Sequence, residues 1–406
     1  MKRAIVLSGG GGKGAYQIGF WKAIRELGIT YDIVTGTSIG ALNGAFMVQG
    51  NYKDAFKLWY DMDYAKVFDG GTNNNSYYTK NGRKKVILKY AKGAMEGGLL
   101  VSGLEKIIDD NLKHDLFYSS NVDYGLITVK FPSLKPAILT KKDIKKEKLK
   151  EYLLATSACF PAFKIKEIDD EAYIDGGYYD NLPIDLAINL GADDIIAVDL
   201  RAPGKRRKQK NMNVHLTLIT PKCDIGNFLV LEKKQARRAM NLGYNDTMKK
   251  FNQLDGDYYT FKKGSLKRNY DRMSYRFYNY LNMSLERKIE NKYSKKLINA
   301  KQKDFNNALE NLMKAFNFDE QKIYRTSIAN VLIKKEYKKE EKLSFALIKK
   351  MIGANKLTKN FVNKEIICYI YDELFIKKTT NKKLSNLALL FPDSYLCAIY
   401  LKTIMR

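Results

Sequence analysis

The sequence predicts an α/β domain with a mainly parallel central sheet, followed by a mostly helical domain. In the first two hundred residues, short apolar runs alternate with segments of helical periodicity, as in domains with a parallel sheet. Glycine-rich turns end the first two apolar runs. Beyond Pro221 the strand-like alternation fades and apolar residues recur at helical spacing. These three observations define the expected fold class.

The expected elements follow one another in a regular order. The run Ala4–Leu7 has the composition of a buried strand, and Gly28 ends the amphipathic helix that comes after it. Ser102 and Glu105 have the spacing of a helix-capping box. Strands are expected at residues 4–7, 31–35, 122–131, 136–140, 195–199 and 215–220. Helices are expected at residues 15–27, from about 41, and at 52–64, 82–90, 101–112, 148–157 and 228–251.

A change from strand-like alternation to helical spacing of apolar residues divides the chain, and we place the boundary near residue 262. The predicted α/β domain covers residues 1–262, with its motifs within 4–185, and the helical domain covers 263–406. In the second domain Phe305, Leu309, Leu312 and Phe316 share one helix face, which predicts a packed core and not a disordered tail. Residues 265–406 hold 30 Lys and Arg against 14 Asp and Glu, a net charge of +16.

The whole chain is strongly basic, with 71 Lys and Arg against 44 Asp and Glu and a net charge of +27. The excess indicates either an anionic partner, such as a phospholipid surface, or a plain solvated basic surface. No zinc-finger spacing, homeodomain pattern or RNP-type motif accompanies the charge, so a nucleic-acid partner is not expected.

Membrane insertion and export are not expected from the sequence either. The N-terminal apolar run ends at Ser8, too short for a signal peptide, and no apolar stretch approaches ~20 residues. The four cysteines form no C-x-x-C pair, which predicts neither a disulfide framework nor a zinc site. We therefore expect a cytoplasmic protein that reaches membranes, if at all, from the side.

The first motif is a glycine-rich loop between the first strand and the first helix. It runs from Gly9 to Gly14 and includes Gly10, Gly11, Gly12 and Lys13. Such a loop lets backbone N–H groups converge on a negative charge. The segment also satisfies G-x-G-x-x-G, so a nucleotide-binding protein is an alternative. A dinucleotide site needs an acidic residue at the end of the second strand, where this chain has Val34 and Thr35. The Walker A motif needs Ser or Thr after its lysine, but Gly14 follows Lys13.

The second motif is G-x-S-x-G at Gly36–Gly40, between the second strand and a helix. In that context the flanking glycines Gly36 and Gly40 permit a sharp turn that presents the Ser38 hydroxyl at the tip of the sheet. The third motif is Asp175-Gly176-Gly177, where an apolar run ends on an acid. Asp-Gly is also a common turn, so this motif gains weight from the scarcity of other bases.

Only two histidines are present, and neither has the context of a catalytic base. His114 lies at a polar helix end and His215 begins a strand. A Ser–His–Asp triad would need one of them to fold back onto Ser38. Asp175 is therefore the candidate base for Ser38, and a triad remains the alternative.

The order of these three motifs resembles the patatin-like phospholipase family. Supporting segments are Ala155–Phe163, which is similar to the family's stretch before its aspartate, Asp180–Pro183, which is similar to the turn after it, and Gly243–Asp246, which is similar to a late helix of bacterial members. The matches cover about the first 250 residues. Lys13 stands where many relatives carry arginine, which keeps the charge but loses the bidentate fork.

The resemblance implies a three-layer fold and a lipid acyl hydrolase of the phospholipase A or lysophospholipase type. It implies that Ser38 attacks an acyl ester, that Asp175 acts as the base, and that N–H groups of Gly10, Gly11 and Gly12 bind the oxyanion. The substrate would be a phospholipid or another acyl lipid, with no cofactor and no metal. Lys13 would either add positive charge at the site or be a surface lysine. The helical domain would either dock on anionic membrane or serve as a partner-binding or stabilising domain.

Overall fold

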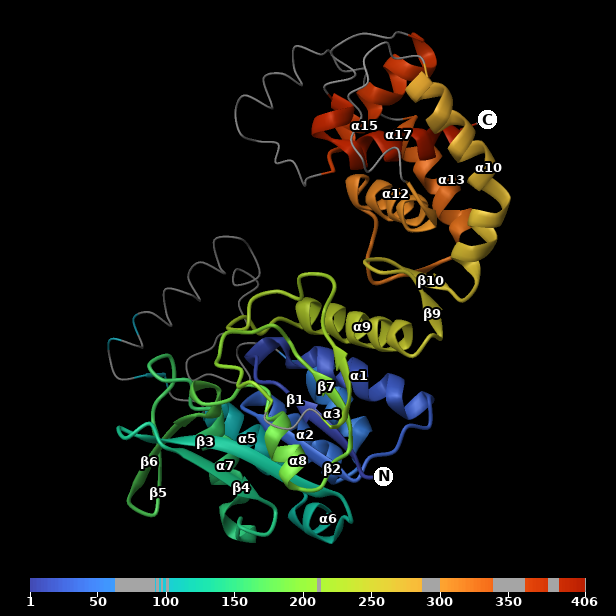
Figure 1. Cartoon of the computed structure of the whole chain (residues 1–406). Coiled ribbons are helices and arrows are strands. Elements are labelled where there is room, and N and C mark those ends of the chain that lie inside the picture. The colour runs from blue at the N-terminus through green and yellow to red at the C-terminus, as the bar shows by residue number, and fades with distance from the viewer. Residues whose placement is uncertain are drawn as a thin grey trace. The chain divides into compact units, whose positions relative to one another are not determined.

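The computed structural model describes residues 1–62, 92, 95, 98–99, 102–209, 213–286, 300–338, 362–378 and 387–405. The helix predicted at residues 82–90 lies outside this part of the chain. Two compact units are present, Met1–Lys250 and Phe251–Arg406 (Figure 1). The division precedes the expected boundary at 262 because Tyr259 and Phe261 are buried in the core of the second unit.

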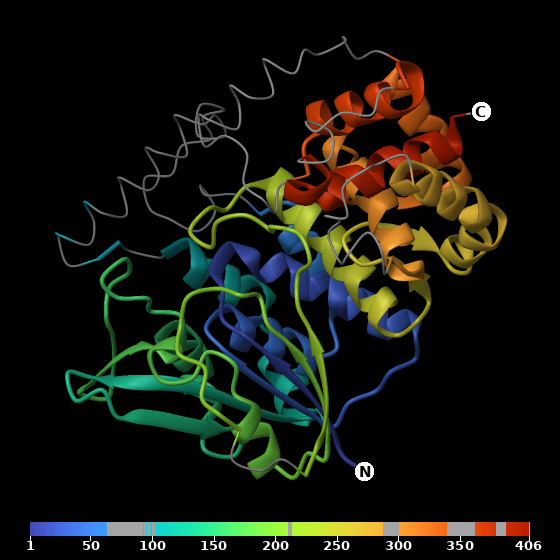
Figure 2. The ribbon, with the colours of Figure 1, turned by 45° about the horizontal axis from the view of Figure 1, so that its top comes forward.

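The first unit is built on a mixed sheet whose centre is parallel. Strands β3 (Asp123–Phe131), β2 (Ile33–Thr37), β1 (Arg3–Leu7), β7 (Asp194–Val198) and β8 (His215–Ile219) run parallel in that order. Strands β4 (Pro136–Thr140) and β6 (Glu171–Asp175) are antiparallel to β3, and β5 (Lys166–Ile168) is antiparallel to β6. Figure 2 shows the same strands from a second angle. The expected mainly parallel sheet is confirmed.

Helices cover both faces of this sheet, which makes the three expected layers. On one face, α8 (Ile184–Asn189) packs on a cluster that includes Ala4 and Ile195. On the other face, α2 (Ile39–Val48) lies close to Leu7 and Val34. Helices α1 (Ala15–Glu26), α3 (Tyr52–Tyr60) and α9 (Lys233–Lys250) pack against one another, and Figure 1 shows α1 and α9 on the opposite side of the strands from α8. Strands covered on both faces are continuously apolar, as in Ala4–Leu7.

The boundaries of two elements differ from those expected. Strand β2 ends at Thr37 and not at Thr35, so Gly36 belongs to the strand. Helix α9 begins at Lys233 and not at residue 228. The cause is local: the Phe228 carbonyl accepts a hydrogen bond from the Gly12 N–H at 2.7 Å, which holds this stretch against the glycine loop. Helices α5 (Ser102–Asn111), α6 (His114–Ser119) and α7 (Leu149–Thr156) complete the first unit.

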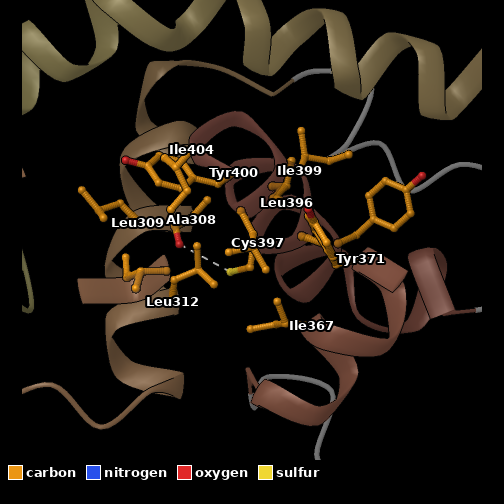
Figure 3. Close-up of a cluster of buried hydrophobic side chains, with 14 of the residues drawn as sticks. Ala308, Leu309, Leu312, Ile367, Tyr371, Leu396, Cys397, Ile399, Tyr400 and Ile404 are labelled. Carbon is orange, nitrogen blue, oxygen red and sulfur yellow. Dashed lines mark hydrogen bonds between the residues drawn. The ribbon is translucent and has the colours of Figure 1, made fainter. Parts of the chain in front are cut away.

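The second unit is mostly helical, as expected. It contains α10 (Ser265–Glu286), α12 (Gln302–Ala315), α13 (Thr326–Tyr337), α15 (Lys364–Tyr371), which continues into a π-helical turn over Asp372–Ile376, and α17 (Pro392–Ile404). Figure 3 shows Leu309 and Leu312 of α12 facing Leu396 and Tyr400 of α17 in its core. The Cys397 thiol donates to the carbonyl of Ala308 at 3.5 Å. The expected apolar helix face is thus buried.

A small sheet in the second unit was not expected. Strand β10 (Thr260–Lys262) pairs with β9 (Leu254–Asp255) and with β11 (Ile323–Tyr324). The carboxylate of Glu310 accepts hydrogen bonds from the N–H groups of residues 257–259 at 2.7–2.9 Å, which fixes the turn between β9 and β10. In the part of the chain that the structure describes, no helix combines the length and the apolar character needed to cross a bilayer.

Candidate active site

Ser38 occupies a sharp turn between β2 and α2. Its backbone has φ 55° and ψ −129°, a conformation that non-glycine residues rarely adopt and that functional sites often hold. The turn depends on both flanking glycines. A Cβ atom on Gly36 would lie 2.4 Å from the Gly40 carbonyl oxygen, and one on Gly40 would lie 2.3 Å from the carbonyl oxygen of Leu7. The sequence therefore folds into the strand–turn–helix that the G-x-S-x-G motif predicts.

Strand pairing brings Asp175 to the same place. Thr37, the last residue of β2, pairs with Ile127 of β3, and Asp175, the last residue of β6, pairs with Thr128. Strand β4 occupies the opposite edge of β3 over residues 125–129, so β2 and β6 share the other edge. The two strands therefore meet end to end, and Ser38 follows directly at the junction.

The Asp175 carboxylate is almost fully buried, with 7% of the residue exposed. Burial raises the pKa of Asp175 from 3.8 to about 6, and hydrogen bonds from the Gly177 N–H and from the Ser38 side chain oppose the rise. The Gly177 N–H lies 2.7 Å from Asp175 Oδ1. Gly176 allows this turn, because a Cβ atom there would lie 2.0 Å from the carbonyl oxygen of Ile127. The result is a serine and a carboxylate that line the same cavity, with the carboxylate more basic than usual.

A threonine not named among the candidate residues holds the serine turn. Thr156, at the end of α7, is fully buried. Its hydroxyl accepts the Ser38 N–H at 2.9 Å and donates to the carbonyl of Ile127 at 2.5 Å. The turn is thereby tied to the same residue of β3 that β2 ends against. The only sequence signal for Thr156 was its place in the segment Ala155–Phe163.

The glycine loop lies beside Ser38, but its N–H groups are not equivalent. Gly9 donates to the carbonyl of Asn181 at 3.1 Å, and Gly12 donates to the carbonyl of Phe228 at 2.7 Å. Gly12 was expected to donate its N–H to the oxyanion, but in this structure that N–H already donates to Phe228. Gly10 and Gly11 line the same cavity as Ser38. These two glycines are the candidate donors.

The remaining loop residues have other surroundings. A Cβ atom on Gly14 would meet side-chain atoms of Ile39 and Trp59 at 2.7–2.9 Å, so this glycine permits close packing. Lys13 is partly exposed in the short 3₁₀ turn Gly11–Gly14. It is not among the described residues that line the cavities next to Ser38.

Two cavities meet at Ser38 and share walls from Gly11, Phe163, Phe228 and Leu229. The narrower one has a volume of about 80 Å³ and is otherwise mainly apolar; its walls include Leu42, Leu58, Trp59, Met62, Leu104 and Ile107. The wider one has a volume of about 400 Å³ and carries the polar groups; its walls include Cys159, Asp175, Tyr178, Asn181 and Lys205. The hydroxyl of Ser38 thus lies between an apolar pocket and a more polar one.

Neither histidine reaches this site. His215 begins β8, and its Nδ1 lies 2.8 Å from Oδ1 of Asp194, the first residue of β7. Strands β2, β7 and β8 run parallel, so the first residues of β7 and β8 lie at the amino ends of the strands. Ser38 follows β2 at the opposite, carboxyl ends of the strands. His114 begins α6, with its Nδ1 2.9 Å from the carbonyl oxygen of Lys146. Neither histidine lines the cavities at Ser38, so this structure does not form the alternative Ser–His–Asp triad.

Asn181 is a second residue whose role the sequence did not predict. Its carbonyl accepts from Gly9, its side-chain amide donates to the carbonyl oxygens of Gly9 and Pro203 at 3.4 Å, and its N–H donates to the carbonyl of Lys205 at 2.6 Å. Asn181 therefore joins the glycine loop to the loop at residues 203–205, which also lines the wider cavity.

Part of the first unit is similar to known proteins. A family model described as patatin-like phospholipase matches residues 5–188. Similar proteins include patatin-like phospholipase domain-containing protein 7 of Rattus norvegicus, with 28% identity over 198 residues, and the neuropathy target esterase sws of Drosophila melanogaster, with 30% identity over 197 residues. Lysophospholipase nte1 of Aspergillus terreus is 29% identical over 199 residues. Each match covers 48% of this chain but only 12–13% of the relative's length.

A solved structure, VipD from Legionella pneumophila, is similar over 100% of this chain and 91% of its own, with 15% identity and a TM-score of 0.40.

Proposed function

We propose that this chain is a lipid acyl hydrolase in which Ser38 is the nucleophile and Asp175 the base. The match of residues 5–188 to a family model described as patatin-like phospholipase supports the proposal. The observation that carries the proposal is the end-to-end meeting of β2 and β6 on one edge of β3. That meeting puts a serine at positive φ and a buried carboxylate on the wall of one cavity.

The chemistry then requires one carboxylate to accept and return a proton in each of two half-reactions. Asp175 accepts the proton of the Ser38 hydroxyl as the serine oxygen attacks the acyl carbonyl. When the tetrahedral intermediate collapses, the same proton passes to the departing alcohol and an acyl-enzyme remains. Asp175 then takes a proton from the water that attacks this ester, and the same proton passes to the Ser38 oxygen as the fatty acid leaves, which restores Ser38. A carboxyl with a pKa of about 6 suits both directions of transfer near neutral pH better than an ordinary aspartate does.

The oxyanion formed in each half-reaction needs hydrogen-bond donors. We assign this role to the N–H groups of Gly10 and Gly11, which line the cavity at Ser38. The N-terminus of α2, which begins immediately after Ser38, adds a favourable dipole. Removing one such donor typically costs on the order of 10²–10³ in rate.

The two cavities fit the two ends of an acyl lipid. The apolar pocket at Leu42 and Trp59 suits the acyl chain, and the wider pocket with Asn181 and Lys205 suits the alcohol part of the ester. A phospholipid or lysophospholipid is the substrate class that this division supports best. Peripheral contact with an anionic membrane stays a prediction from the basic charge.

The nucleotide-binding alternative meets a steric obstacle. Cβ atoms built on Gly11 and Gly12 would lie 2.3 Å from the carbonyl oxygens of Phe228 and Val230, respectively. The stretch at residues 228–230 thus lies against the loop that a pyrophosphate would have to approach. A nucleic-acid binder without catalysis would leave the Ser38–Asp175 contact unexplained.

A fluorophosphonate probe tests the proposed nucleophile directly. We expect the full chain to be labelled at Ser38, because these probes react with serines activated by a neighbouring base. Peptide mass mapping identifies the labelled residue, and turnover of phosphatidylcholine and lysophosphatidylcholine is measured with and without the probe. Labelling at another serine, or full turnover after complete labelling of Ser38, would reject the proposal.

The pKa of Asp175 predicts the pH dependence of hydrolysis. A base with a pKa of about 6 is protonated at lower pH, so kcat/KM should fall about tenfold per pH unit below that value and level off above it. The measurement uses a soluble chromogenic ester between pH 4.5 and 8, with circular dichroism at each pH to show that the fold persists. A midpoint near 4 would contradict a buried base.

A further inference from the structure

A basic groove lies in the second unit, far in sequence from Ser38. It is a cavity of about 580 Å³ between the first turns of α10 and α13 and the end of β10. Five cationic side chains line it: Lys262, Lys263, Arg268, Arg272 and Arg325. None of the described residues that line it is acidic.

The groove continues between the two helices. An adjoining cavity of about 300 Å³ shares Arg272 and Ser327 with the first and adds Arg276 and Lys334. Seven cationic side chains therefore follow one path along α10 and α13. Figure 1 shows these two helices with β10 near their starting ends.

Backbone dipoles add to this positive charge. α10 begins at Ser265 and α13 begins at Thr326, and both residues line the groove. The Ser265 hydroxyl accepts the Thr326 N–H at 2.9 Å, so the two helix starts are held together. Two N-termini at one cavity, each with a partial positive charge, form a preorganised setting for an anion.

Within the described residues, this charge is hardly neutralised. Lys263 forms an ion pair with Asp255 at 3.3 Å, and it is the only one of the seven with a carboxylate partner there. Arg268, Arg272 and Arg276 follow one another at four-residue spacing on α10, where like charges repel. A groove of this kind becomes favourable when an anion occupies it.

We propose that the basic groove binds a ligand that carries two or more phosphate groups. Arginine forks pair with phosphate oxygens in bidentate geometry, and helix N-termini complement the same group. The two adjoining cavities, of about 580 and 300 Å³, have room for more than one phosphate. The source is either a free polyphosphorylated compound or lipid headgroups with a phosphate monoester. This site is independent of hydrolysis at Ser38.

Isothermal titration of the full chain with tripolyphosphate tests the proposal. At about 0.15 M salt, saturable binding is expected, and the double variant Arg268→Gln/Arg325→Gln should raise Kd by about tenfold or more. The matched control is Lys267→Gln/Lys335→Gln, which removes the same charge from exposed positions in the same two helical regions, outside the groove walls. Its Kd should stay within about twofold of the parent value, since screened surface charges contribute little.

Vesicles distinguish the two sources. Phosphatidylcholine vesicles containing phosphatidic acid expose phosphate monoesters, and vesicles with phosphatidylserine at equal surface charge do not. Retention on the phosphatidic acid vesicles alone, lost in the arginine variant, assigns the site to lipid headgroups. Tripolyphosphate binding without vesicle retention assigns it to a free compound. Equal losses in the two double variants, equal retention on both kinds of vesicle, or no saturable binding of tripolyphosphate or of either vesicle would overturn the proposal.

Discussion

Replacing Asp175 by asparagine should lower the kcat of ester hydrolysis by about 10³-fold or more, because no other carboxylate or imidazole among the described residues lines the cavities at Ser38. Both histidines are held elsewhere by Asp194 and by the carbonyl of Lys146. Ser38→Ala should reduce hydrolysis to the background rate, since no acyl-enzyme can then form. Turnover of a chromogenic acyl ester measures both effects, and near-normal kcat in the Asp175 variant would reject the dyad.

Asp180→Asn is the matched control for the aspartate. Asp180 is as buried as Asp175, with 4% exposed, and burial likewise raises the pKa of Asp180 to about 6. Its Oδ1 accepts the N–H of Leu182, a bond that an asparagine oxygen can also accept, and it is not among the described residues of the cavity walls. This variant should keep activity within a few-fold. A loss equal to that of Asp175→Asn would mean that a buried charge in this region serves the fold and not the reaction.

The free energy of unfolding of the Asp175→Asn variant also distinguishes a catalytic role of this carboxylate from a structural one. The folded-state pKa of Asp175 is raised, so the fold favours the protonated form, and that stabilisation, present below pH 3.8, is lost as the pH rises through about 6. At neutral pH the neutral amide should therefore leave the free energy of unfolding unchanged or raise it. An inactive variant that is equally or more stable fits a functional carboxylate. An inactive variant with a lower free energy of unfolding would instead indicate that the carboxylate stabilises the fold.

The sequence located Ser38 and Asp175 through local motifs, whereas their contact is non-local. The turn at Ser38 follows from two glycines and a strand that precedes them, all within a few residues. The contact arises because β6 runs antiparallel along the same edge of β3 that β2 occupies. These pairings join Thr37 to Ile127 and Thr128 to Asp175, residues far apart in the sequence, and such pairing leaves no local pattern. Only the resemblance to a family supplied that expectation.

Local sequence patterns also failed to predict features that depend on hydrogen bonds to main-chain groups. The role of Thr156 rests on its hydroxyl bonding two main-chain groups, and an α9 starting at Lys233 rests on the Phe228 carbonyl meeting the Gly12 N–H. Neither has a periodic signal. In the second unit the helices were predictable because apolar residues recur along them, whereas strands of two or three residues are shorter than any usable period.

A backbone contact between two helices gives the largest expected effect on stability. Gly243→Ala should lower the free energy of unfolding of the first unit by about 3 kcal/mol. A Cβ atom on Gly243 of α9 would lie 2.0 Å from the carbonyl oxygen of Tyr16 in α1, and one on Gly19 of α1 would lie 1.9 Å from the carbonyl oxygen of Met240. No side-chain rotation relieves a clash with backbone, so the helices must separate. The gain of ~1 kcal/mol in helix propensity does not offset this.

The matched control is Gly44→Ala, in the interior of α2. A Cβ atom there would meet only side chains, with Val34 Cγ1 at 2.9 Å, and these can shift. Denaturant unfolding followed by tryptophan fluorescence reports the first unit alone, since Trp21 and Trp59 are the two tryptophans of the chain. Gly243→Ala should also reduce hydrolysis, because α1 begins directly after the glycine loop and moves with it. Equal destabilisation by the two substitutions would contradict a backbone contact between α1 and α9.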